Sequence, residues 1–464
     1  MSRKGFRRLG WWTILVGTRR VMRSWLLSLA VVCVVIGAAK EAEAKTLNVA
    51  NNGVDSLTCG DKKSPCRSIS KAIANAASGD DIIVGPGRYG DLNGNGTFEL
   101  AGGEEKAEVG SGCNCMIKVD KPLTIESRDG AAATVLDAGL AGVDVVLIEP
   151  SASGTVFGKK KKGFTLTLGG MNGLDIAGGT VGVRVAGNLA TVNGNKGFRV
   201  DGSGHVLTGN LASLNNQLGF SISGNGHVLS SNVANANGAG FLISSNSSNG
   251  HLLSGNIANA NGGIGFIIDG GSGHVLTSNS ALGNTDFGIE ILVGSSVVIT
   301  KNNIFGNHGS CNVGNNSGLL NNSGVTINAT NNFWGAATGP GGNPADDFCS
   351  TELGSITNFA PFATKEFKVK VKILDESPSE ALPVESDLSR EAKRFWAEEE
   401  TRVQLVDLQG HLKYDSGWQT SSMLSQLHER LPGLANGVYL YTLRERDQEG
   451  REIHREVKKF IIRR

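Results

Sequence analysis

Apolar residues recur in three short groups per repeat between residues 173 and 307. Each repeat opens with glycine and an apolar–x–apolar triplet, and two further apolar positions follow. The triplets are Leu174/Ile176, Phe198/Val200, Phe220/Ile222, Phe241/Ile243, Phe266/Ile268 and Ile289/Ile291. The second position holds Val185, Leu207, Leu229, Leu253, Leu276 and Ile299, and the third holds Ala190, Ala212, Ala234, Ala258, Ala281 and Ile304. Short apolar groups divided by Gly, Asn and Ser predict three strands per repeat.

A pair of asparagines with an inner spacing of five sets the register of these repeats. The pairs are Asn188/Asn193, Asn210/Asn215, Asn232/Asn237, Asn256/Asn261, Asn279/Asn284 and Asn302/Asn307, at steps of 22, 22, 24, 23 and 23 residues. Periods of 20–25 residues indicate a coil stacked on itself, so equivalent side chains should form ladders about 4.8 Å apart. A leucine-rich horseshoe has a similar period, but regularly spaced leucines are missing here.

The asparagines have a structural and a ligand-binding interpretation. At a corner between strands, asparagine tolerates the left-handed backbone conformation and can hydrogen-bond to its own copies on neighbouring coils. We therefore expect structural corner residues. Histidine also recurs, at His205, His227, His251 and His274, which suggests a metal ladder. Valine holds the aligned position in the flanking repeats, at Val183 and Val297, so packing is the preferred interpretation.

The segment before the repeats predicts a cap for the coil. Residues 46–56 suggest a strand and turn, and Ile69, Ala72, Ile73 and Ala76 share one face of a helix that Gly79 should end. Residues 81–84 then form a short apolar strand, followed by a turn at residues 85–87. Further strands are expected at 116–119, 123–125 and 145–148, as the first coils.

Residues 65–73 and the run Gly79-Asp80-Asp81-Ile82-Ile83-Val84-Gly85-Pro86-Gly87-Arg88-Tyr89 resemble the entry segment of right-handed parallel β-helix proteins of the pectin-lyase-like superfamily. Asn331-Asn332-Phe333-Trp334-Gly335, with Thr338-Gly339-Pro340, resembles the closing motif of many secreted members. The resemblance implies an all-β chain with a right-handed parallel β-helix and an N-terminal capping helix. It implies no particular activity, since the superfamily contains lyases, hydrolases, esterases, epimerases and proteins without known chemistry.

Composition changes after residue 364. Residues 365–400 suggest a strand and a linker, and residues 401–464 alternate as a small β-sandwich. The run Gly437-Val438-Tyr439-Leu440-Tyr441 resembles immunoglobulin-like C-terminal modules of secreted bacterial proteins, some of which serve sorting or surface attachment. The expected domains are thus a β-helix over 45–364, a strand and linker over 365–400, and a β-sandwich over 401–464.

The N-terminus is typical of a cleaved export signal. Arg23 precedes an apolar run from Trp25 to Ala39, and Ala42-Glu43-Ala44 fits the small–x–small cleavage pattern. We expect a signal peptide over residues 1–44, with Met22 as the suspected true start, and no transmembrane span after cleavage. A retained anchor is the alternative, although the run is shorter than the roughly 20 residues of a membrane span. The expected location is extracytoplasmic: secreted, at the cell surface or periplasmic.

Six cysteines follow the signal, and an even count in an exported chain favours disulfides. We expect the pairs Cys59–Cys66 and Cys311–Cys349; a Cys113–Cys115 bond would be strained. Zinc is the alternative.

Residues 91–99 place Asp91, Asn93, Asn95 and Glu99 at spacings that suit a calcium loop, although Gly102 stands where a bidentate glutamate is usual. Calcium is therefore the candidate cofactor, and a polar surface turn is the alternative.

Charge is sparse within the repeats. Residues 202–268 contain no Asp, Glu, Lys or Arg, and the chain after residue 44 is weakly acidic, with 36 basic and 41 acidic residues. Nucleic acid is therefore not an expected partner. Asp175, Arg199 and Asp201 can meet on neighbouring coils and are the candidate catalytic residues. Asp269 and Glu290 can also meet on neighbouring coils. The run Lys159–Lys162 is typical of a solvated loop, with an acidic glycan as the alternative.

The outward positions of the second strand are mildly apolar and rich in hydroxyls. They are Val206/Thr208, Val228/Ser230, Leu252/Ser254, Val275/Thr277 and Val298/Thr300. We expect a structural or binding protein without catalysis, directed at polysaccharide or cell-envelope material. The alternative is a polysaccharide lyase or glycoside hydrolase of the superfamily, which would need carboxylates that the repeats lack.

Overall fold

The computed structural model describes residues 44–93, 98, 104–105, 113–244, 248–292, 294–311 and 314–369. It also describes the backbone of five strands between residues 400 and 462. The expected signal peptide, apart from Ala44, lies outside these residues. No helix in the described part is long and apolar enough to cross a membrane.

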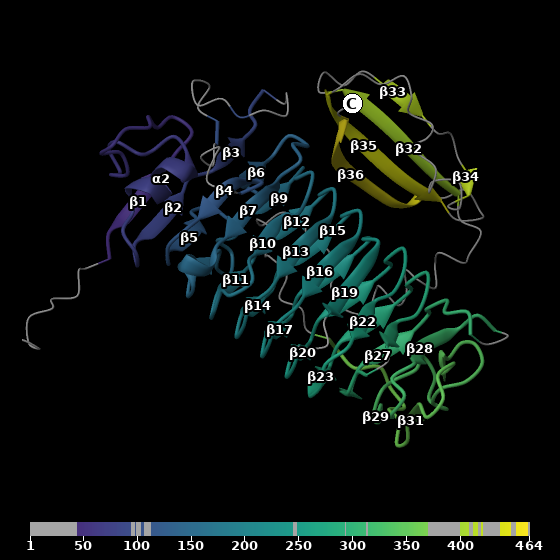
Figure 1. Ribbon diagram of the computed structural model, residues 1–464. Helices are drawn as coiled ribbons and strands as arrows, with labels where there is room; N and C mark the ends of the chain where they lie inside the picture. Colours follow the sequence, from purple (N-terminus) through teal and green to yellow (C-terminus); the bar gives the residue numbers. More distant parts are fainter. Residues whose placement is uncertain are drawn as a thin grey trace, which may run out of the picture. The chain divides into compact units, whose positions relative to one another are not determined.

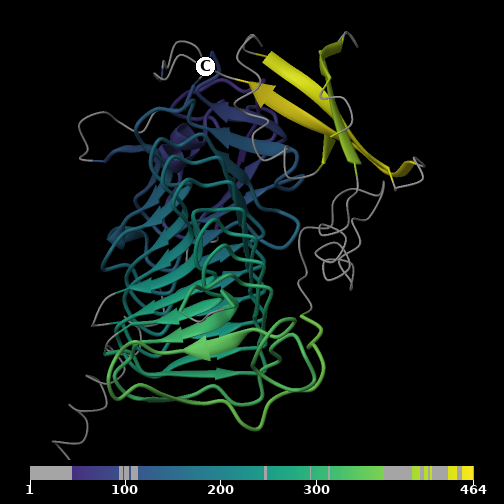
Figure 2. The ribbon, with the colours of Figure 1, turned by 90° about the vertical axis from the view of Figure 1, so that its right-hand side faces the viewer.

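Three parallel sheets wind around one axis, each taking one strand from a coil (Figures 1 and 2). The 12-stranded sheet contains β1 (Thr46–Val49), β2 (Asp81–Val84), β5 (Thr124–Ser127), β8 (Val156–Phe157), β11 (Arg184–Ala186), β14 (Val206–Thr208), β17 (Val228–Ser230), β20 (Leu252–Ser254), β23 (His274–Thr277), β26 (Val297–Thr300), β29 (Thr326–Asn328) and β31 (Ile356–Asn358).

The 10-stranded sheet contains β4 (Cys115–Val119), β7 (Asp144–Ile148), β10 (Leu174–Ile176), β13 (Lys196–Val200), β16 (Leu218–Ile222), β19 (Ala239–Ser244), β22 (Phe266–Asp269), β25 (Ile289–Ile291), β28 (Ser317–Asn321) and β30 (Asp347–Cys349). The 9-stranded sheet contains β3 (Gly87–Gly90), β6 (Thr134–Asp137), β9 (Thr165–Thr167), β12 (Leu189–Thr191), β15 (Leu211–Ser213), β18 (Val233–Asn235), β21 (Ile257–Asn259), β24 (Ser280–Leu282) and β27 (Asn303–Phe305). The predicted parallel β-helix with three strands per repeat is confirmed.

The entry cap forms as expected, with one difference. Helix α2 (Ile69–Asn75) buries Ile69, Ala72 and Ile73, and the Ser68 hydroxyl accepts a hydrogen bond from the Lys71 N–H at its start. The helix ends at Asn75, before the predicted stop at Gly79, because Ala76 already adopts an extended backbone. The short strands β3, β6 and β8 were not predicted, and β3 begins within the expected turn at residues 85–87. A short 3₁₀ helix, η2 (Pro150–Ala152), lies between β7 and β8.

Two asparagine ladders run along the coil axis. In the first ladder, the backbone N–H and the Nδ2 of Asn210 both donate to Oδ1 of Asn232 on the next coil, at 3.0 and 2.9 Å. Nδ2 of Asn210 also donates to the Val185 carbonyl on the previous coil. Every polar atom of such a side chain therefore has a partner although the residue is buried. The second ladder repeats this pattern from Asn193 to Asn307.

The ladders end on residues outside the six repeats. Asn332 accepts from both nitrogens of Asn302 and so adds a seventh rung to the first ladder. Asp346 accepts from Asn307 in the same way and closes the second ladder with a carboxylate. Burial raises the pKa of Asp346 to about 7, against the hydrogen bonds that it accepts. The structural interpretation of the asparagines accounts for all their side-chain contacts.

The prediction that these asparagines take the left-handed backbone conformation is wrong. The residue before each one takes positive φ instead: Gly187, Val192, Gly209, Leu214, Ser231, Ala236, Gly255, Ala260, Ser278, Gly283, Lys301 and Gly306. The chain thus turns one residue earlier than predicted. The asparagine that follows can then point its amide into the coil, where a left-handed residue would direct its side chain elsewhere.

The four histidines form a buried stack inside the coil. Neighbouring rings lie 4.8, 4.9 and 5.0 Å apart and are nearly parallel. Nδ1 of His205 accepts the Val183 N–H, and Nδ1 of His227 accepts the His205 N–H. Nε2 of His205 lies 2.8 Å from the Asp201 carbonyl and must donate to it, so the ring is neutral with its proton on Nε2. These bonds favour packing over a metal ladder.

Apolar side chains fill the remaining interior in rows. Phe198, Phe220, Phe241 and Phe266 stack with ring centroids 4.7–4.9 Å apart. The glycine that opens each repeat is required by this packing. A Cβ at Gly197 would lie 2.9 Å from the Ala212 Cβ and 3.0 Å from the Asn215 Nδ2.

The C-terminal module has one antiparallel sheet in its described part. The order is β33 (Leu412–Asp415), β32 (Glu400–Asp407), β35 (Gly437–Arg446) and β36 (Glu452–Ile462), and β34 (Gln419–Thr420) pairs with β32. The second layer of a sandwich and the immunoglobulin-like resemblance stay predictions, as do the domain boundaries. Most of the expected strand and linker over 365–400 lies outside the described residues.

Removing one ladder amide should destabilise the coil strongly. Asn232→Ala leaves the buried N–H and Nδ2 of Asn210 without their acceptor, so we expect a loss of about 3 kcal/mol. The exposed Asn216→Ala is the matched control and should cost under about 0.5 kcal/mol. Chemical denaturation measures both, and equal midpoints for the two variants would contradict the structural interpretation.

The histidine stack should resist protonation. Burial lowers the pKa of His205 to about 4 and that of His251 to about 3, and it lowers those of His227 and His274. Unfolded imidazoles bind protons near pH 6.5, so the unfolded chain takes up more protons below that pH. The histidines' contribution to stability is therefore present above about pH 6.5 and lost as the pH falls towards 4. Ring carbon-13 shifts should report neutral imidazoles for His205 and His251 at pH 5.5, whereas half-protonation of these two near pH 6.5 would contradict the packing described.

Candidate functional site

The outer face of the 12-stranded sheet carries two straight rows of side chains. Strand register aligns the first row as Val206, Val228, Leu252, Val275 and Val298, with Arg184 at the preceding position on β11. It aligns the second row as Thr208, Ser230, Ser254, Thr277 and Thr300, with Ala186 at the preceding position. We call these the apolar row and the hydroxyl row. Leu252 and Val298 are each 38% exposed, so apolar surface reaches solvent along the first row.

The rows are regular because the interior ladders hold each coil in register. Thr208 Oγ1 and Ser230 Oγ lie 3.0 Å apart within the hydroxyl row. One apolar and one hydroxyl-bearing side chain thus recur on each coil from β14 to β26. The spacing along each row is that of neighbouring strands, about 4.8 Å.

The three catalytic candidates meet on the outer face of the 10-stranded sheet. Nη1 of Arg199 on β13 donates to both carboxylate oxygens of Asp175 on β10, each at 2.9 Å. Nη2 of Arg199 lies 3.9 Å from Asp201 Oδ2. Burial raises the pKa of Asp175, against the opposing influence of Arg199. Arg199 and Asp175, two of the three catalytic candidates, are therefore paired with each other.

Two further ionisable residues join this cluster and were not among the candidates. Asp144 on β7 accepts hydrogen bonds from the N–H and Nδ2 of Asn172, and burial raises its pKa to about 6. Lys196 on β13 has its pKa lowered by burial and by Arg199. Asp144 lies one coil before the aligned repeats, where the asparagine pairs are absent. Aligning Val146 with Leu174, the first residue of an apolar triplet, would have brought Asp144 into the comparison.

The second acidic pair gives a weaker site. Glu290 faces outward on β25, and its pKa is raised by burial and by the charges of Asp286 and Asp269. Asp269 is exposed at the end of β22. The charge of Asp269 raises the pKa of Glu290, in agreement with their expected proximity. No cation among the described residues pairs with Glu290.

The candidate calcium loop is only partly described. Asp91 is buried, and Asn93 is exposed. The N–H groups of Leu92 and Asn93 donate to Oε1 of Glu104, at 2.9 and 3.2 Å. Asn95 and Glu99 lie outside the described residues, so the calcium site stays a prediction.

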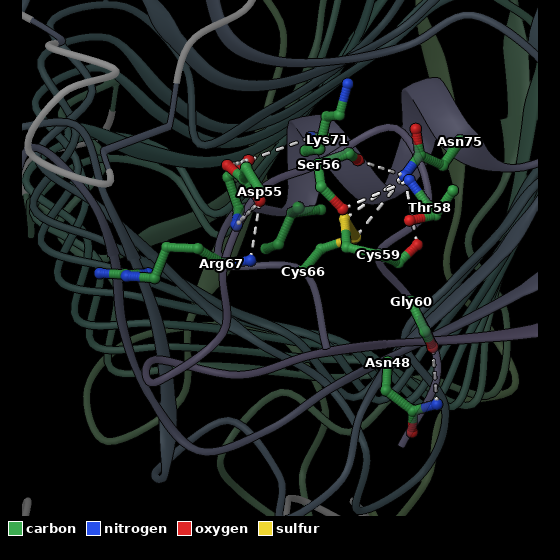
Figure 3. Close-up of a disulfide and its surroundings, with 12 residues drawn as sticks. Asn48, Asp55, Ser56, Thr58, Cys59, Gly60, Cys66, Arg67, Lys71 and Asn75 are labelled. Carbon is green, nitrogen blue, oxygen red and sulfur yellow. Dashed lines mark hydrogen bonds between the residues drawn. A yellow bond between two sulfur atoms is a disulfide. The ribbon is translucent and has the colours of Figure 1, made fainter. Parts of the chain in front are cut away.

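The structure joins cysteines in the two expected pairs, Cys59–Cys66 and Cys311–Cys349, and also joins Cys113 to Cys115. The first bond lies at the entry cap, where Asn75 Nδ2 donates to the Cys59 carbonyl (Figure 3). Asp55, Cys59 and Cys66 are the one group of three potential metal-ligating side chains that lie close together in the described part. Its sulfurs are bonded to each other, and Asp55 accepts hydrogen bonds from the Arg67 and Ser68 N–H groups. This cluster therefore does not support the zinc alternative.

Comparison with solved structures finds proteins of low sequence identity to this chain. Pectate lyase Pel9A is 17% identical, covers 70% of this chain and 79% of its own, and gives a TM-score of 0.40. The Azotobacter vinelandii mannuronan C-5 epimerase AlgE6 A-module is 15% identical, with coverages of 64% and 94% and a TM-score of 0.41. An alginate lyase from Paenibacillus sp. str. FPU-7 is 14% identical, with coverages of 69% and 97% and a TM-score of 0.38.

The three parallel sheets of this chain form a parallel β-helix. No protein-family model matches the sequence, and no curated protein matches it either. At these identities the likeness concerns the fold and carries no activity to this chain.

The Arg199–Asp175 pair should stabilise the coil in a pH-dependent way. Arg199→Gln leaves a buried carboxylate without its cation, so we expect a loss of about 1 to 2 kcal/mol at pH 7. The loss should shrink as the pH falls towards 4, because Asp175 then folds protonated without penalty. Chemical denaturation at both pH values measures it. The exposed Arg184→Gln is the control, and a deficit independent of pH would contradict the pairing.

Proposed function

We propose that the chain is an exported carbohydrate-binding protein without catalysis, and that it binds glycan along the apolar and hydroxyl rows of the 12-stranded sheet. The observation that carries the proposal is the continuity of both rows over the coils from β14 to β26. Such a surface offers one apolar contact and one hydroxyl per coil, over a length that suits a linear chain molecule.

Sugar rings match this alternation chemically. Each ring has apolar C–H faces, which can contact Val228, Leu252 or Val275, and hydroxyls, which can exchange hydrogen bonds with the serines and threonines. Hydroxyl groups both donate and accept, so they tolerate different sugar orientations along the row. The absence of charged residues from 202–268 favours uncharged contacts in the middle of the face.

Several features support export. The N-terminal segment is typical of a signal peptide, and disulfides persist in oxidising compartments. The three disulfides agree with this location. We place the protein outside the cytoplasm, with the C-terminal module as a candidate attachment or sorting unit.

Lyase or hydrolase activity is the second candidate function, and one observation favours it. Asp144, with a pKa of about 6, lies near Lys196, whose pKa is lowered, and such shifted groups suit proton transfer near neutral pH. The pairing of Asp175 with Arg199 argues against catalysis, because a catalytic carboxylate or base must be available to the substrate.

Binding and cleavage can be separated with one panel of glycans, tested with and without calcium. We expect retention of at least one polysaccharide without new reducing ends and without unsaturated ends that absorb in the ultraviolet. Products that form with the wild-type chain and disappear with Asp144→Asn would support the second candidate and contradict the first.

The binding face can be tested by one substitution and its matched control. Leu252→Asp places a charge in the apolar row and should weaken glycan binding at least about tenfold, through loss of roughly 1.4 kcal/mol of contact. Leu353, which is 93% exposed in the loop between β30 and β31, serves as the control as Leu353→Asp. Calorimetric titration measures both variants, and equal affinities would exclude this face.

A further inference from the structure

The disulfide at the start of the 10-stranded sheet closes a very short stretch of chain. Cys113 and Cys115 are two residues apart in sequence, whereas the other two pairs are separated by 7 and 38 residues. A disulfide stabilises a fold mainly by restricting the unfolded chain, and this effect grows with the length of the closed loop. The fold therefore loses least when the Cys113–Cys115 bond opens.

Exposure also separates this bond from the disulfide at the entry cap. Cys59 and Cys66 are 2% and 0% exposed, whereas Cys113 is half-buried and Asn114 is exposed. An external thiolate must reach a sulfur atom in order to exchange with it. The third disulfide is partly exposed as well, but it closes the longest loop. Short loop and accessible sulfur thus coincide at Cys113.

The two sulfurs of this bond lie in different surroundings. Cys115 is 7% exposed and begins β4, the end strand of the 10-stranded sheet. Cys113 precedes the strand and is the more exposed of the two. A thiolate that attacks Cys113 makes the buried Cys115 sulfur the leaving group. Departure as a buried thiolate is costly unless a proton or a positive charge meets the sulfur.

Strand register places a carboxyl group beside Cys115. Cys115 pairs with Asp144 on β7, and the Asp144 N–H donates to the Asn114 carbonyl. Residues paired across neighbouring parallel strands point to the same side of the sheet, about 4.8 Å apart. Asp144 is 5% exposed, and both hydrogen bonds from Asn172 end on its Oδ1. No hydrogen bond from another described residue ends on Oδ2, so this oxygen can carry a proton.

The charged groups around Asp144 are Asp175, Arg199 and Lys196. Burial is the main cause that raises the pKa of Asp144 to about 6. The charge of Asp175 adds to this effect, while the hydrogen bonds from Asn172 and the charge of Arg199 oppose it. A carboxyl group with this pKa is partly protonated near neutral pH and can donate its proton to a leaving thiolate.

We propose that Cys113 and Cys115 form an exchangeable disulfide that oxidises dithiols, with Asp144 as the proton donor to the Cys115 sulfur. The substrate class is a dithiol of another exported polypeptide, because disulfide exchange takes place in the compartments where disulfides persist. This activity is independent of glycan binding on the 12-stranded sheet.

The exchange takes two steps. In the first, one thiolate of the dithiol attacks Cys113 Sγ and the disulfide breaks. The electron pair of that bond stays on Cys115 Sγ, which takes the proton of Asp144. In the second step, the other thiolate attacks the substrate sulfur bonded to Cys113 and releases Cys113 as a thiolate, which takes a proton from water. The dithiol leaves as a disulfide, both cysteines end as thiols, and Asp144 regains a proton from solvent.

The order in which the three disulfides open tests the inference on the wild-type chain. Limiting dithiothreitol is added, samples are quenched in acid and alkylated, and mass spectrometry locates the free thiols. We expect Cys113 and Cys115 to react at least about tenfold faster than the other four cysteines, with unchanged circular dichroism. Earlier opening of Cys59–Cys66 or Cys311–Cys349, or joint opening of all three, would overturn the inference.

Glutathione, a monothiol, identifies the sulfur that is attacked. Excess reduced glutathione is mixed with the wild-type chain, and the mixed disulfide is trapped by acid within the first turnover. We expect the adduct on Cys113, because Cys115 leaves as a buried thiol. An adduct confined to Cys115 would contradict the direction of the exchange.

The substitution Asp144→Asn separates proton donation from a structural role, because asparagine can still accept both hydrogen bonds from Asn172. We expect dithiothreitol to open the Cys113–Cys115 bond of this variant at least about tenfold more slowly than in the wild type at pH 5.5. The two rates should converge at pH 8, where Asp144 of the wild type is ionised. The thiolate fraction of dithiothreitol is the same for both proteins at each pH, so it cancels in the ratio.

The control is Asp120→Asn, at an exposed site just after β4, which should match the wild type at both pH values. A rate ratio for Asp144→Asn that does not change with pH would limit Asp144 to a structural role and contradict the proposed proton transfer.

Discussion

The axial hydrogen bond between stacked asparagine amides is the interaction on which the rest of the structure depends. Each corner of a narrow coil buries backbone N–H and carbonyl groups that no strand can pair. The Asn210 N–H donates to Asn232 Oδ1, and the Asn210 Nδ2 donates to the Val185 carbonyl and to Asn232 Oδ1. Because each amide needs the next, the ladders hold every coil in one register from Asn188 to Asn332 and from Asn193 to Asp346.

That register has a consequence on the outside of the coil. Side chains on equivalent strand positions align into straight rows, as from Val206 to Val298 and from Thr208 to Thr300. Inside, the same alignment stacks Phe198 on Phe220 and His205 on His227. Conspicuous interior residues are thus structural, and the chemistry available to a ligand lies on the outer faces and at the inserted corners.

Much of the fold could be predicted from sequence because the repeat itself carries the information. Three strands per repeat and the entry helix follow from spacing and residue type, whereas the closing role of the 331–335 motif is implied only by the resemblance and stays a prediction. The position of the left-handed residue could not be predicted, since Val192, Leu214 and Lys301 have no intrinsic preference for it. The asparagine after each one dictates that conformation through contacts made a coil away.

Sequence alone predicted only the outer sites whose residues lie within the aligned repeats. Arg199 and Asp175 lie one repeat apart within the aligned region, so their meeting could be foreseen. Asp144 precedes the aligned asparagines, and it accepts two hydrogen bonds from Asn172 on the next coil. The position of residues 159–162 also needed the structure, because strand register places Gly158 in line with Ala186 and Thr208.

A crystal structure of the chain with a bound oligosaccharide would show directly which face binds the ligand. We expect sugar density along the outer face of the 12-stranded sheet, with rings against Val228 and Leu252 and hydroxyls near Ser230 and Ser254. Density centred on Asp144, Asp175 and Arg199 instead, on the 10-stranded sheet, would contradict it.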